Sequence, residues 1–293
     1  MPETALETVA IAGVGLIGGS FALALRQAGF RGAILGVSSP RTIARALALH
    51  VIDEGVTLEQ ACARAGLVYL AGPIHSILET IPRLDALLRP GALVTDAGST
   101  KSLICQAGAR LSRAQFLGGH PMAGKELRGV ESAEAGLFHG RPYLLTPRRP
   151  EDLDTPAAGE FVEWVRRIGA VPKILAPEQH DQVVALSSHL PQLLSTALAS
   201  GLGRQDCGAD VAAAAGPGLL DSTRLALSAW DIWRDILDTN QEAILAAMDL
   251  FADRWKELRE TMAHGVLEED FRQGRAFAEM LRAQRSNNGD TSR

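Results

Sequence analysis

Thr8-Val-Ala-Ile-Ala-Gly-Val-Gly-Leu-Ile-Gly-Gly-Ser20 is the stretch of this chain that decides its fold. A short apolar run over residues 9–12 leads directly into a glycine-rich turn, and a helical pattern follows over residues 19–28. A buried strand, a Gly-x-Gly-x-x-Gly turn and a helix in this order are typical of a dinucleotide-binding unit. The N-terminal part of the chain is therefore expected to bind a nucleotide cofactor.

The glycines of this turn suit three different tasks. Gly13 allows a tight turn, Gly15 lets the backbone approach a pyrophosphate, and Gly18 lets the helix pack closely on the strand. The backbone amides at Leu16 and Ile17 would then face the phosphates, and the helix dipole would assist them. An ordinary structural turn is the alternative interpretation. The strand before the turn and the helix after it favour cofactor binding.

Apolar runs of strand length alternate with helical patterns as far as about residue 175. They occupy residues 33–37, 67–71, 92–95, 115–118, 143–146 and 171–175. This alternation predicts an α/β domain over residues 1–176, with a Rossmann-type, doubly wound and mainly parallel sheet.

The strand pattern stops after Ala176-Pro177, and the chain becomes rich in Ala and Leu. Helical patterns cover residues 178–201, 211–215, 219–227 and 229–284. We expect an all-helical substrate and dimerisation domain over residues 177–284, followed by a disordered polar tail over residues 285–293. Residues 183–202 are apolar around more of the helix than one monomer core needs, which predicts a homodimer.

Bulk composition indicates a soluble enzyme with two domains. The chain has 293 residues, 46% of them hydrophobic, and a net charge of −5 without a basic block, which disfavours nucleic acid as a partner. The cysteines, Cys62, Cys105 and Cys207, lack metal-ligand spacing, so no metal is expected and a reducing compartment is favoured. The N-terminus lacks the positive segment of a signal peptide, and glycines interrupt its apolar stretch, so a cytoplasmic protein without a membrane partner is expected.

The end of the second expected strand bears on the phosphate state of the cofactor. NAD sites usually present an acid there to the ribose 2′-hydroxyl, but this chain has Ser38 and Ser39, with Arg41 close by. Small hydroxyls and an arginine suit a 2′-phosphate, so NADP is favoured and NAD stays possible. A second interpretation, compatible with the first, makes Ser39 the N-cap of a helix with Pro40 in its first turn.

Two polar segments follow later strands, where ligands bind in open α/β sheets. Asp96-Ala-Gly-Ser-Thr-Lys101 contains Ser99, whose alternative role, shared with Thr100, is to cap a helix. His120 lies on an expected loop between a glycine pair and a proline, which is unusual for a core histidine. Histidine is also the side chain best suited to proton transfer near neutral pH.

Together these motifs resemble the prephenate/arogenate dehydrogenase family of tyrosine biosynthesis. The motifs that carry the resemblance are Gly13-Val-Gly-Leu-Ile-Gly-Gly-Ser20, Asp96-Ala-Gly-Ser-Thr-Lys101, Gly119-His-Pro-Met-Ala-Gly124 with Glu126 and residues 136–138, Ser188-His-Leu-Pro191 and Asp221-Ser-Thr-Arg224. The glycine motif alone is shared with many dehydrogenases. Its combination with the later motifs is far more specific.

The resemblance implies both a fold and a reaction. Family members join a nucleotide-binding domain to a helical dimerisation domain, with the active site between them. They oxidatively decarboxylate prephenate to 4-hydroxyphenylpyruvate, or arogenate to tyrosine, and pass a hydride to NAD or NADP. Such an enzyme needs a base for the C4 hydroxyl proton and a cation for a carboxylate.

The resemblance also implies roles for single residues. His120 would accept the proton of the C4 hydroxyl, and Ser99 would orient that histidine and bridge to the nicotinamide. Arg224 would clamp a substrate carboxylate, for which its planar fork of donors is suited. His189 would line the substrate pocket. Without the family pattern, Arg224 would be expected to form a surface or interdomain ion pair, and His189 would be expected to lie in a helix core.

Two further positions have less defined roles in this pattern. Glu126 would lie near the pocket entrance, and Lys101 would act on the substrate electrostatically. The sequence leaves the choice between prephenate and arogenate open, although Asp181 is a candidate partner for the ammonium group that only arogenate carries.

Two other functions stay open at this point. The first is a different dehydrogenase, of the β-hydroxyacid or imine-reducing type, which would not need His120. The second is a non-catalytic NADP-binding dimer that acts as a sensor. A sensor needs no base, so the joint presence of Ser99, His120 and Arg224 disfavours it.

Overall fold

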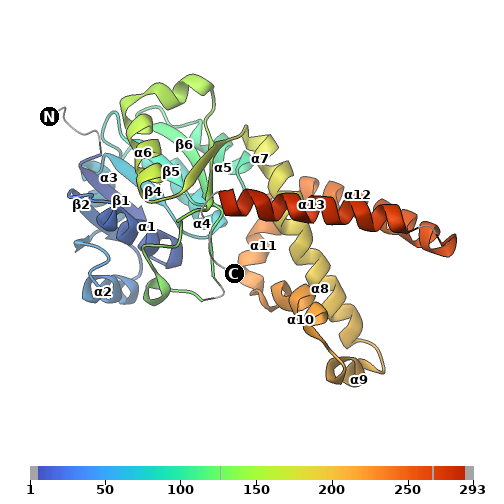
Figure 1. Ribbon diagram of the computed structural model, residues 1–293. Helices are drawn as coiled ribbons and strands as arrows, with labels where there is room; N and C mark the ends of the chain where they lie inside the picture. Colours follow the sequence, from blue (N-terminus) through green and yellow to red (C-terminus); the bar gives the residue numbers. More distant parts are fainter. Residues whose placement is uncertain (1–5, 126, 266, 288–293) are drawn as a thin grey trace. The chain divides into compact units, whose positions relative to one another are not determined.

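The computed structural model describes residues 6–125, 127–265 and 267–287. The chain divides into two compact units, which we describe separately: Met1–His180 with Phe271–Arg293, and Asp181–Asp270 (Figure 1). The domain boundary expected at residues 176–177 falls just before this division and stays a prediction. Of the expected disordered tail, residues 285–287 continue a helix and the others lie outside the described residues.

The first unit contains one eight-stranded sheet with the order β3-β2-β1-β4-β5-β6-β7-β8. Its strands are β1 (Thr8–Ala12), β2 (Ala33–Val37), β3 (Glu54–Gly55), β4 (Leu67–Leu70), β5 (Leu93–Asp96), β6 (Gln115–Pro121), β7 (Pro142–Thr146) and β8 (Val171–Ile174). All neighbouring strands are parallel except β6 and β7. The doubly wound, mainly parallel sheet is confirmed, and the strand order reverses at β1, between β2 and β4.

Helices connect most of the successive strands of this sheet, and one more helix follows the last strand (Figure 1). They are α1 (Leu16–Gln27), α2 (Pro40–Ala48), α3 (Leu58–Arg64), α4 (Ile74–Leu84), α5 (Ser102–Gly108), α6 (Pro156–Arg167) and α7 (Pro177–Val184). Helix α1 begins at Leu16, earlier than expected, because Gly15 is its N-cap. The first-turn amides of α1 therefore belong to the glycine turn itself, which is the position that binds anions.

A cluster of buried aromatic rings fixes α1 on the sheet. Phe21 stacks on Tyr69 of β4 with ring centroids 4.1 Å apart, and Phe138 and Phe161 contact it at 6.5 Å and 6.3 Å. All four side chains are fully buried. Burial of each ring stabilises the fold by roughly 1.5–3 kcal/mol, so the start of α1 is held firmly against the strand ends.

The second unit is helical, as expected. It contains a π-helical turn (Ala185–His189), α8 (Leu190–Gly203), α9 (Gly208–Ala213), α10 (Pro217–Thr223), a 3₁₀ turn (Arg224–Leu227), α11 (Trp230–Thr239), α12 (Gln241–Ala263) and the start of α13 (Glu268–Asn287). The helix expected over residues 178–201 is interrupted by the π turn. Pro191 has no N–H to donate to the carbonyl of Ser187, so the turn before it widens.

Large apolar side chains are exposed on the second unit. Leu250, Trp255 and Met262 of α12 are 63%, 62% and 68% exposed, and Trp230 of α11 is 66% exposed. Exposed apolar residues in this number are typical of a surface that binds another protein. None of the helices in the described residues is long and apolar enough to span a bilayer.

Candidate cofactor and active site

The glycine turn has the space that a pyrophosphate needs. Gly13 has φ +101°, and a Cβ atom there would lie 2.7 Å from the carbonyl carbon of Ala71. A Cβ at Gly18 would lie 2.2 Å from the carbonyl oxygen of Gly13. At Gly15, by contrast, a Cβ would meet nothing within 4 Å. The first and third glycines are thus required by packing, and the second leaves open space in front of the first turn of α1.

A cavity of about 520 Å³ adjoins this turn at the carboxyl ends of β1, β2 and β4. It is lined by Ala12, Gly13, Val37, Ser38, Leu58, Glu59, Leu70, Gly72, Pro73, Ser76, Ile77, Thr80 and Arg83. The structure therefore brings Gly13 and Ser38 to one cavity, at the point where the strand order reverses. Dinucleotides bind at this point in doubly wound sheets, and the residues present fit such a cofactor.

The three residues predicted to read the 2′ position lie in different surroundings. Ser38 is exposed in the cavity wall. Ser39 is the N-cap of α2, since its hydroxyl accepts a hydrogen bond from the Thr42 amide at 3.3 Å, so the capping interpretation is confirmed. Arg41 lines a separate shallow hollow with Arg45 and Glu131.

Sequence analysis missed two charged residues of the cavity. Glu59 of α3 and Arg83 of α4 approach each other to 3.8 Å, and both line the cavity that contains Ser38. Both are far from the glycine turn in the sequence, and neither belongs to a recognisable motif. Both residues line the cavity only because the fold brings α3 and α4 to it, which no local sequence pattern shows.

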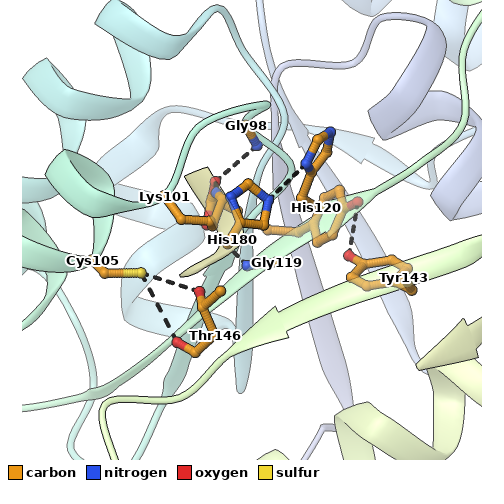
Figure 2. A network of polar contacts seen from close by, with 10 residues as sticks. Gly98, Lys101, Cys105, Gly119, His120, Tyr143, Thr146 and His180 are labelled. Carbon is orange, nitrogen blue, oxygen red and sulfur yellow. Dashed lines mark hydrogen bonds and ion pairs between the residues drawn. The ribbon is translucent and has the colours of Figure 1, made fainter. Parts of the chain in front are cut away.

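A buried aspartate, Asp96, fixes the loop after β5. Figure 2 labels three of its partners, Gly98, Lys101 and Gly119. The carboxylate of Asp96, at the end of β5, accepts hydrogen bonds from the Gly98 amide at 2.8 Å and the Gly119 amide at 3.1 Å. It also forms an ion pair with Lys101, and both side chains are fully buried. The structure thus places the ammonium of Lys101, a predicted substrate-binding group, against Asp96. Removing either partner would break a fully buried ion pair, which is strongly destabilising.

Ser99 lies in the loop that Asp96 fixes and is partly exposed. Helix α5 begins only at Ser102, with Lys101 as its N-cap and without a side-chain capping bond. The alternative in which Ser99 or Thr100 caps this helix is therefore wrong. Because β5 and β6 are parallel neighbours, the loop with Ser99 and the end of β6 with His120 share one edge of the sheet.

His120 is a strand residue rather than a loop residue, because β6 extends to Pro121. Only 8% of His120 is exposed, and its Nδ1 lies 2.9 Å from Nε2 of His180 on α7 (Figure 2). His180 is fully buried. His180 could not be found from the sequence, because no motif or spacing pairs residues that are 60 positions apart.

The residue before His120 must be small. A Cβ at Gly119 would lie 2.7 Å from the carbonyl oxygen of Asp96 and 3.2 Å from a ring carbon of Tyr143. The Tyr143 hydroxyl donates a hydrogen bond to that of Tyr69 at 3.2 Å, and burial raises the pKa of both phenols. Burial thus keeps both phenols neutral, and the absence of a side chain at Gly119 lets β6 approach Tyr143 and β5 closely.

In the second unit, His189 ends the π turn and is almost fully buried. Its Nδ1 lies 3.3 Å from Nδ2 of Asn240, which also donates to the backbone carbonyl of Asp181 at 2.9 Å. The ring of Trp233 packs edge-on against the imidazole, with centroids 5.9 Å apart. Asp181 is itself only 4% exposed.

Arg224 begins the 3₁₀ turn and is exposed. Two buried polar residues of α8 hold this turn: Gln192 donates to the carbonyl of Leu225 at 2.8 Å, and Ser195 accepts from the amide of Ala226 at 3.1 Å. Sequence analysis missed Gln192, Ser195 and Asn240. Buried polar side chains in an otherwise apolar helix were the available signal.

Glu126 lies outside the described residues. Within the part of the chain that the structure describes, no cluster of three or more His, Cys, Asp or Glu side chains could hold a metal ion.

Two family models match nearly all of this chain. The nucleotide-binding domain of prephenate dehydrogenase matches residues 21–172, and the dimerization domain of prephenate dehydrogenase matches residues 176–282. Both matches follow the order of the α/β and helical parts.

Individual proteins agree with these matches. The prephenate dehydrogenase of Bacillus subtilis is 34% identical over 252 residues, which are 83% of this chain and 67% of that protein. The cyclohexadienyl dehydrogenase of Zymomonas mobilis is 31% identical over 271 residues, 89% of this chain and 90% of that protein. A crystal structure of prephenate dehydrogenase from A. aeolicus, in complex with hydroxyphenyl propionate and NAD+, has a TM-score of 0.84 at 33% identity, covering 93% of this chain and 97% of that one.

Proposed function

The chain belongs to the prephenate dehydrogenase family, and we propose that it catalyses the NADP-linked oxidative decarboxylation of prephenate or arogenate. The observation that carries this proposal is the position of His120. It is a nearly buried imidazole at the carboxyl end of β6, on the same edge of the sheet as the glycine turn. A proton acceptor at this edge is what oxidation of a hydroxyl requires.

The reaction removes a hydride from C4 of the substrate ring, a proton from the C4 hydroxyl and carbon dioxide from C1. A bound nicotinamide cofactor supplies the hydride acceptor. The electrons of the O–H bond form the C4 carbonyl as the hydride leaves. When the bond from C1 to the carboxylate breaks, its electron pair moves into the ring, which becomes aromatic, and the C4 oxygen takes back the proton from the base to give the phenol. Aromatisation drives the step, so the protein needs mainly to orient the substrate and to accept one proton.

His120 receives the hydroxyl proton in this proposal. Ser99, on the neighbouring loop, orients the hydroxyl and the imidazole and also contacts the nicotinamide. Lys101 acts indirectly, since its ammonium is paired with Asp96 and keeps that loop in place. Its effect on the substrate would be through the position of Ser99.

The residues of the second unit bind the rest of the substrate in this proposal. Arg224 clamps a carboxylate with its planar guanidinium, and Gln192 and Ser195 fix the turn that carries it. His189 is assigned to the substrate pocket, and the entrance role expected of Glu126 falls on a residue outside those that the structure describes.

The preference for NADP rests on Ser38. The cavity wall at the end of β2 carries this hydroxyl where NAD enzymes usually carry an acid, and Arg41 follows closely in the sequence. Gly13, Gly15, Leu16, Ile17 and Gly18 would hold the pyrophosphate. The alternative cofactor is NAD, which lacks the 2′-phosphate.

The substrate is one of two closely related acids. Arogenate differs from prephenate by an ammonium in place of a ketone, and Asp181 is the acid that we assign to this group. Steady-state kinetics with both substrates and both cofactors test the proposal directly. Turnover of neither substrate would refute it, and a large kcat/KM advantage for arogenate that Asp181→Asn removes would support the role of Asp181.

A homodimer completes the proposal. The exposed Trp and Leu side chains of α11 and α12, together with the match to a dimerization domain, support association of two copies through the helical unit. Light scattering at low micromolar concentration should give twice the mass of one chain, which is 31.1 kDa. A stable, active monomer would contradict this assembly.

A further inference from the structure

The buried pair of imidazoles constrains where protons can lie. Nδ1 of His120 and Nε2 of His180 are 2.9 Å apart, which is a hydrogen-bond distance, so one proton lies between them. We propose that His180 is a positioning residue whose Nε2 accepts a hydrogen bond from the Nδ1–H group of His120 and thereby keeps Nε2 of His120 unprotonated. This inference rests on the proposed function, in which His120 is the base.

Only one of the two possible proton arrangements permits catalysis. A neutral imidazole carries one proton, and a base must present an unprotonated nitrogen. If His120 donates through Nδ1, its Nε2 can accept the substrate proton, and His180 carries its own proton on Nδ1. If His180 donates instead, the proton of His120 lies on Nε2 and the base is blocked. His180 therefore has to be the acceptor.

The same hydrogen bond becomes stronger during the reaction. As the C4 hydroxyl proton moves to Nε2, the O–H bond breaks, an N–H bond forms and His120 becomes an imidazolium. Its bond to His180 changes from a neutral to a charge-assisted hydrogen bond. An interaction that strengthens only as charge develops lowers the barrier of the step rather than the energy of the bound substrate.

Both imidazoles are attached to a fixed backbone. His120 lies on β6 and pairs with Leu144 of β7, and the preceding amide of Gly119 donates to buried Asp96. His180 is fully buried in the first turns of α7, and its amide donates to the carbonyl of Ala176 at 2.8 Å. With both attachments fixed, the ring of His120 is held in one orientation.

Two substitutions of His180 distinguish its role as a hydrogen-bond acceptor from its role in filling the buried space. His180→Phe fills a similar volume but cannot accept a hydrogen bond, whereas the side-chain oxygen of His180→Gln can. We expect His180→Phe to lower kcat by roughly 10–100-fold, part of the effect of losing a general base, while KM changes less than about threefold. His180→Gln should retain kcat within about fivefold, since the acceptor is restored.

A spectroscopic measurement reports the tautomer without turnover. Ring ¹⁵N–¹H NMR of protein labelled on its seven histidines should show His120 protonated on Nδ1 in the wild type, assigned by the signals that His120→Asn removes. His180→Phe should add the tautomer protonated on Nε2, and His180→Gln should not. The exposed His264→Gln is the matched control and should change neither kcat nor the His120 signals.

The outcomes distinguish this inference from the function on which it rests. Wild-type His120 protonated on Nε2, unchanged kcat in His180→Phe, or equal losses in His180→Gln and His180→Phe would each overturn the role of His180. If His180→Phe does not fold, as judged by NADPH binding, the tautomers of the wild type and His180→Gln decide. If His120→Asn retains full kcat, the proposed base itself is wrong, whatever His180 does.

Discussion

Nδ2 of Asn240 lies 3.3 Å from Nδ1 of His189. The same amide nitrogen is 2.9 Å from the carbonyl oxygen of Asp181, which can only accept, so this atom is the donor. His189 therefore accepts through Nδ1 and, as a neutral ring, carries its proton on Nε2. Nε2 of His189 is then a hydrogen-bond donor, and in the proposed function its acceptor would be a carboxylate or carbonyl oxygen of the substrate.

Replacing Asn240 with Asp should impair substrate binding, because a carboxylate reverses this hydrogen bond and draws the His189 proton to Nδ1. One lost hydrogen bond corresponds to roughly a tenfold rise in KM. Steady-state kinetics on Asn240→Asp measure this rise, and NADPH affinity is the control for an intact first unit. An unchanged KM would show that the His189 tautomer does not matter for binding.

Removing the proposed base should mainly lower kcat. His120→Asn keeps a polar side chain but cannot take the proton, so kcat should fall by roughly 10²–10⁴ with a smaller change in KM. Wild-type activity should also fall at acidic pH as the imidazole protonates. A pH–rate profile of both proteins tests this. An identical acidic limb in the variant would mean that another group titrates.

Arg224 should behave differently from His120, because a carboxylate clamp contacts the substrate throughout the reaction. Arg224→Ala should raise KM by about tenfold or more and leave kcat within about threefold. Arg224→Lys is the matched variant, which keeps the charge and loses the planar fork of donors. Its KM should lie between that of the wild type and that of Arg224→Ala. If Arg224→Ala lowers kcat alone, Arg224 acts on the transition state and does not bind the substrate.

Cofactor preference should depend on the charge at the end of β2. Ser38→Asp places a carboxylate where the 2′-phosphate of NADP would lie, and the repulsion should reduce the ratio of kcat/KM for NADP over NAD by about tenfold or more. Ser38→Asn has a similar size without charge and should leave the ratio nearly unchanged. A wild-type enzyme that prefers NAD tenfold would contradict the assignment.

Asp85 provides a test of stability against pH. The hydroxyl of Ser112 and the amides of Arg113 and Ser112 donate to its carboxylate at 2.7–3.0 Å and hold its pKa below the ordinary value of 3.8. Such a group stabilises the fold above its unfolded-state pKa, and the contribution is lost as pH falls through the lower folded-state value. Asp85→Asn should therefore lower Tm near pH 7, and the difference from wild type should shrink below about pH 4.

Glu79→Gln on the exposed side of α4 is the matched control for this change and should leave Tm unaltered. Thermal melts followed by circular dichroism between about pH 3 and 7 provide the comparison. A Tm difference that is constant with pH would show that the charge of Asp85 is not the stabilising feature.

The α/β half of this protein was predictable because its signals are local. Buried parallel strands are continuous apolar runs, and the glycines at 13 and 18 are fixed by contacts within one strand–turn–helix unit. The helical half was predictable only as helical. Its interruption at the π turn depends on how the chain accommodates Pro191, and the strength of the Ala and Leu pattern concealed it.

The site shows the same limit. His120 and Ser99 could be selected from the sequence, because each follows a strand in an unusual context. His180 contacts His120, and Asn240 contacts His189, and both partners are more than 50 positions away in the sequence. No motif or residue spacing could therefore identify them. Lys101 was expected to act electrostatically on the substrate, which stays a prediction, and the structure shows its ammonium in a buried ion pair with Asp96. A charged pair inside an otherwise buried motif was the available clue.

The π turn at Ala185–His189 amounts to one residue more than a regular helix would need. Deleting a single residue there, such as Ser187, would remove the extra residue, yet it would rotate every later side chain of α8 by about 100°. Gln192 and Ser195 would then face away from the turn that begins at Arg224. The number of residues in this segment therefore determines which way the side chains of α8 point. A deletion that makes the helix more regular should still move the guanidinium of Arg224 out of position.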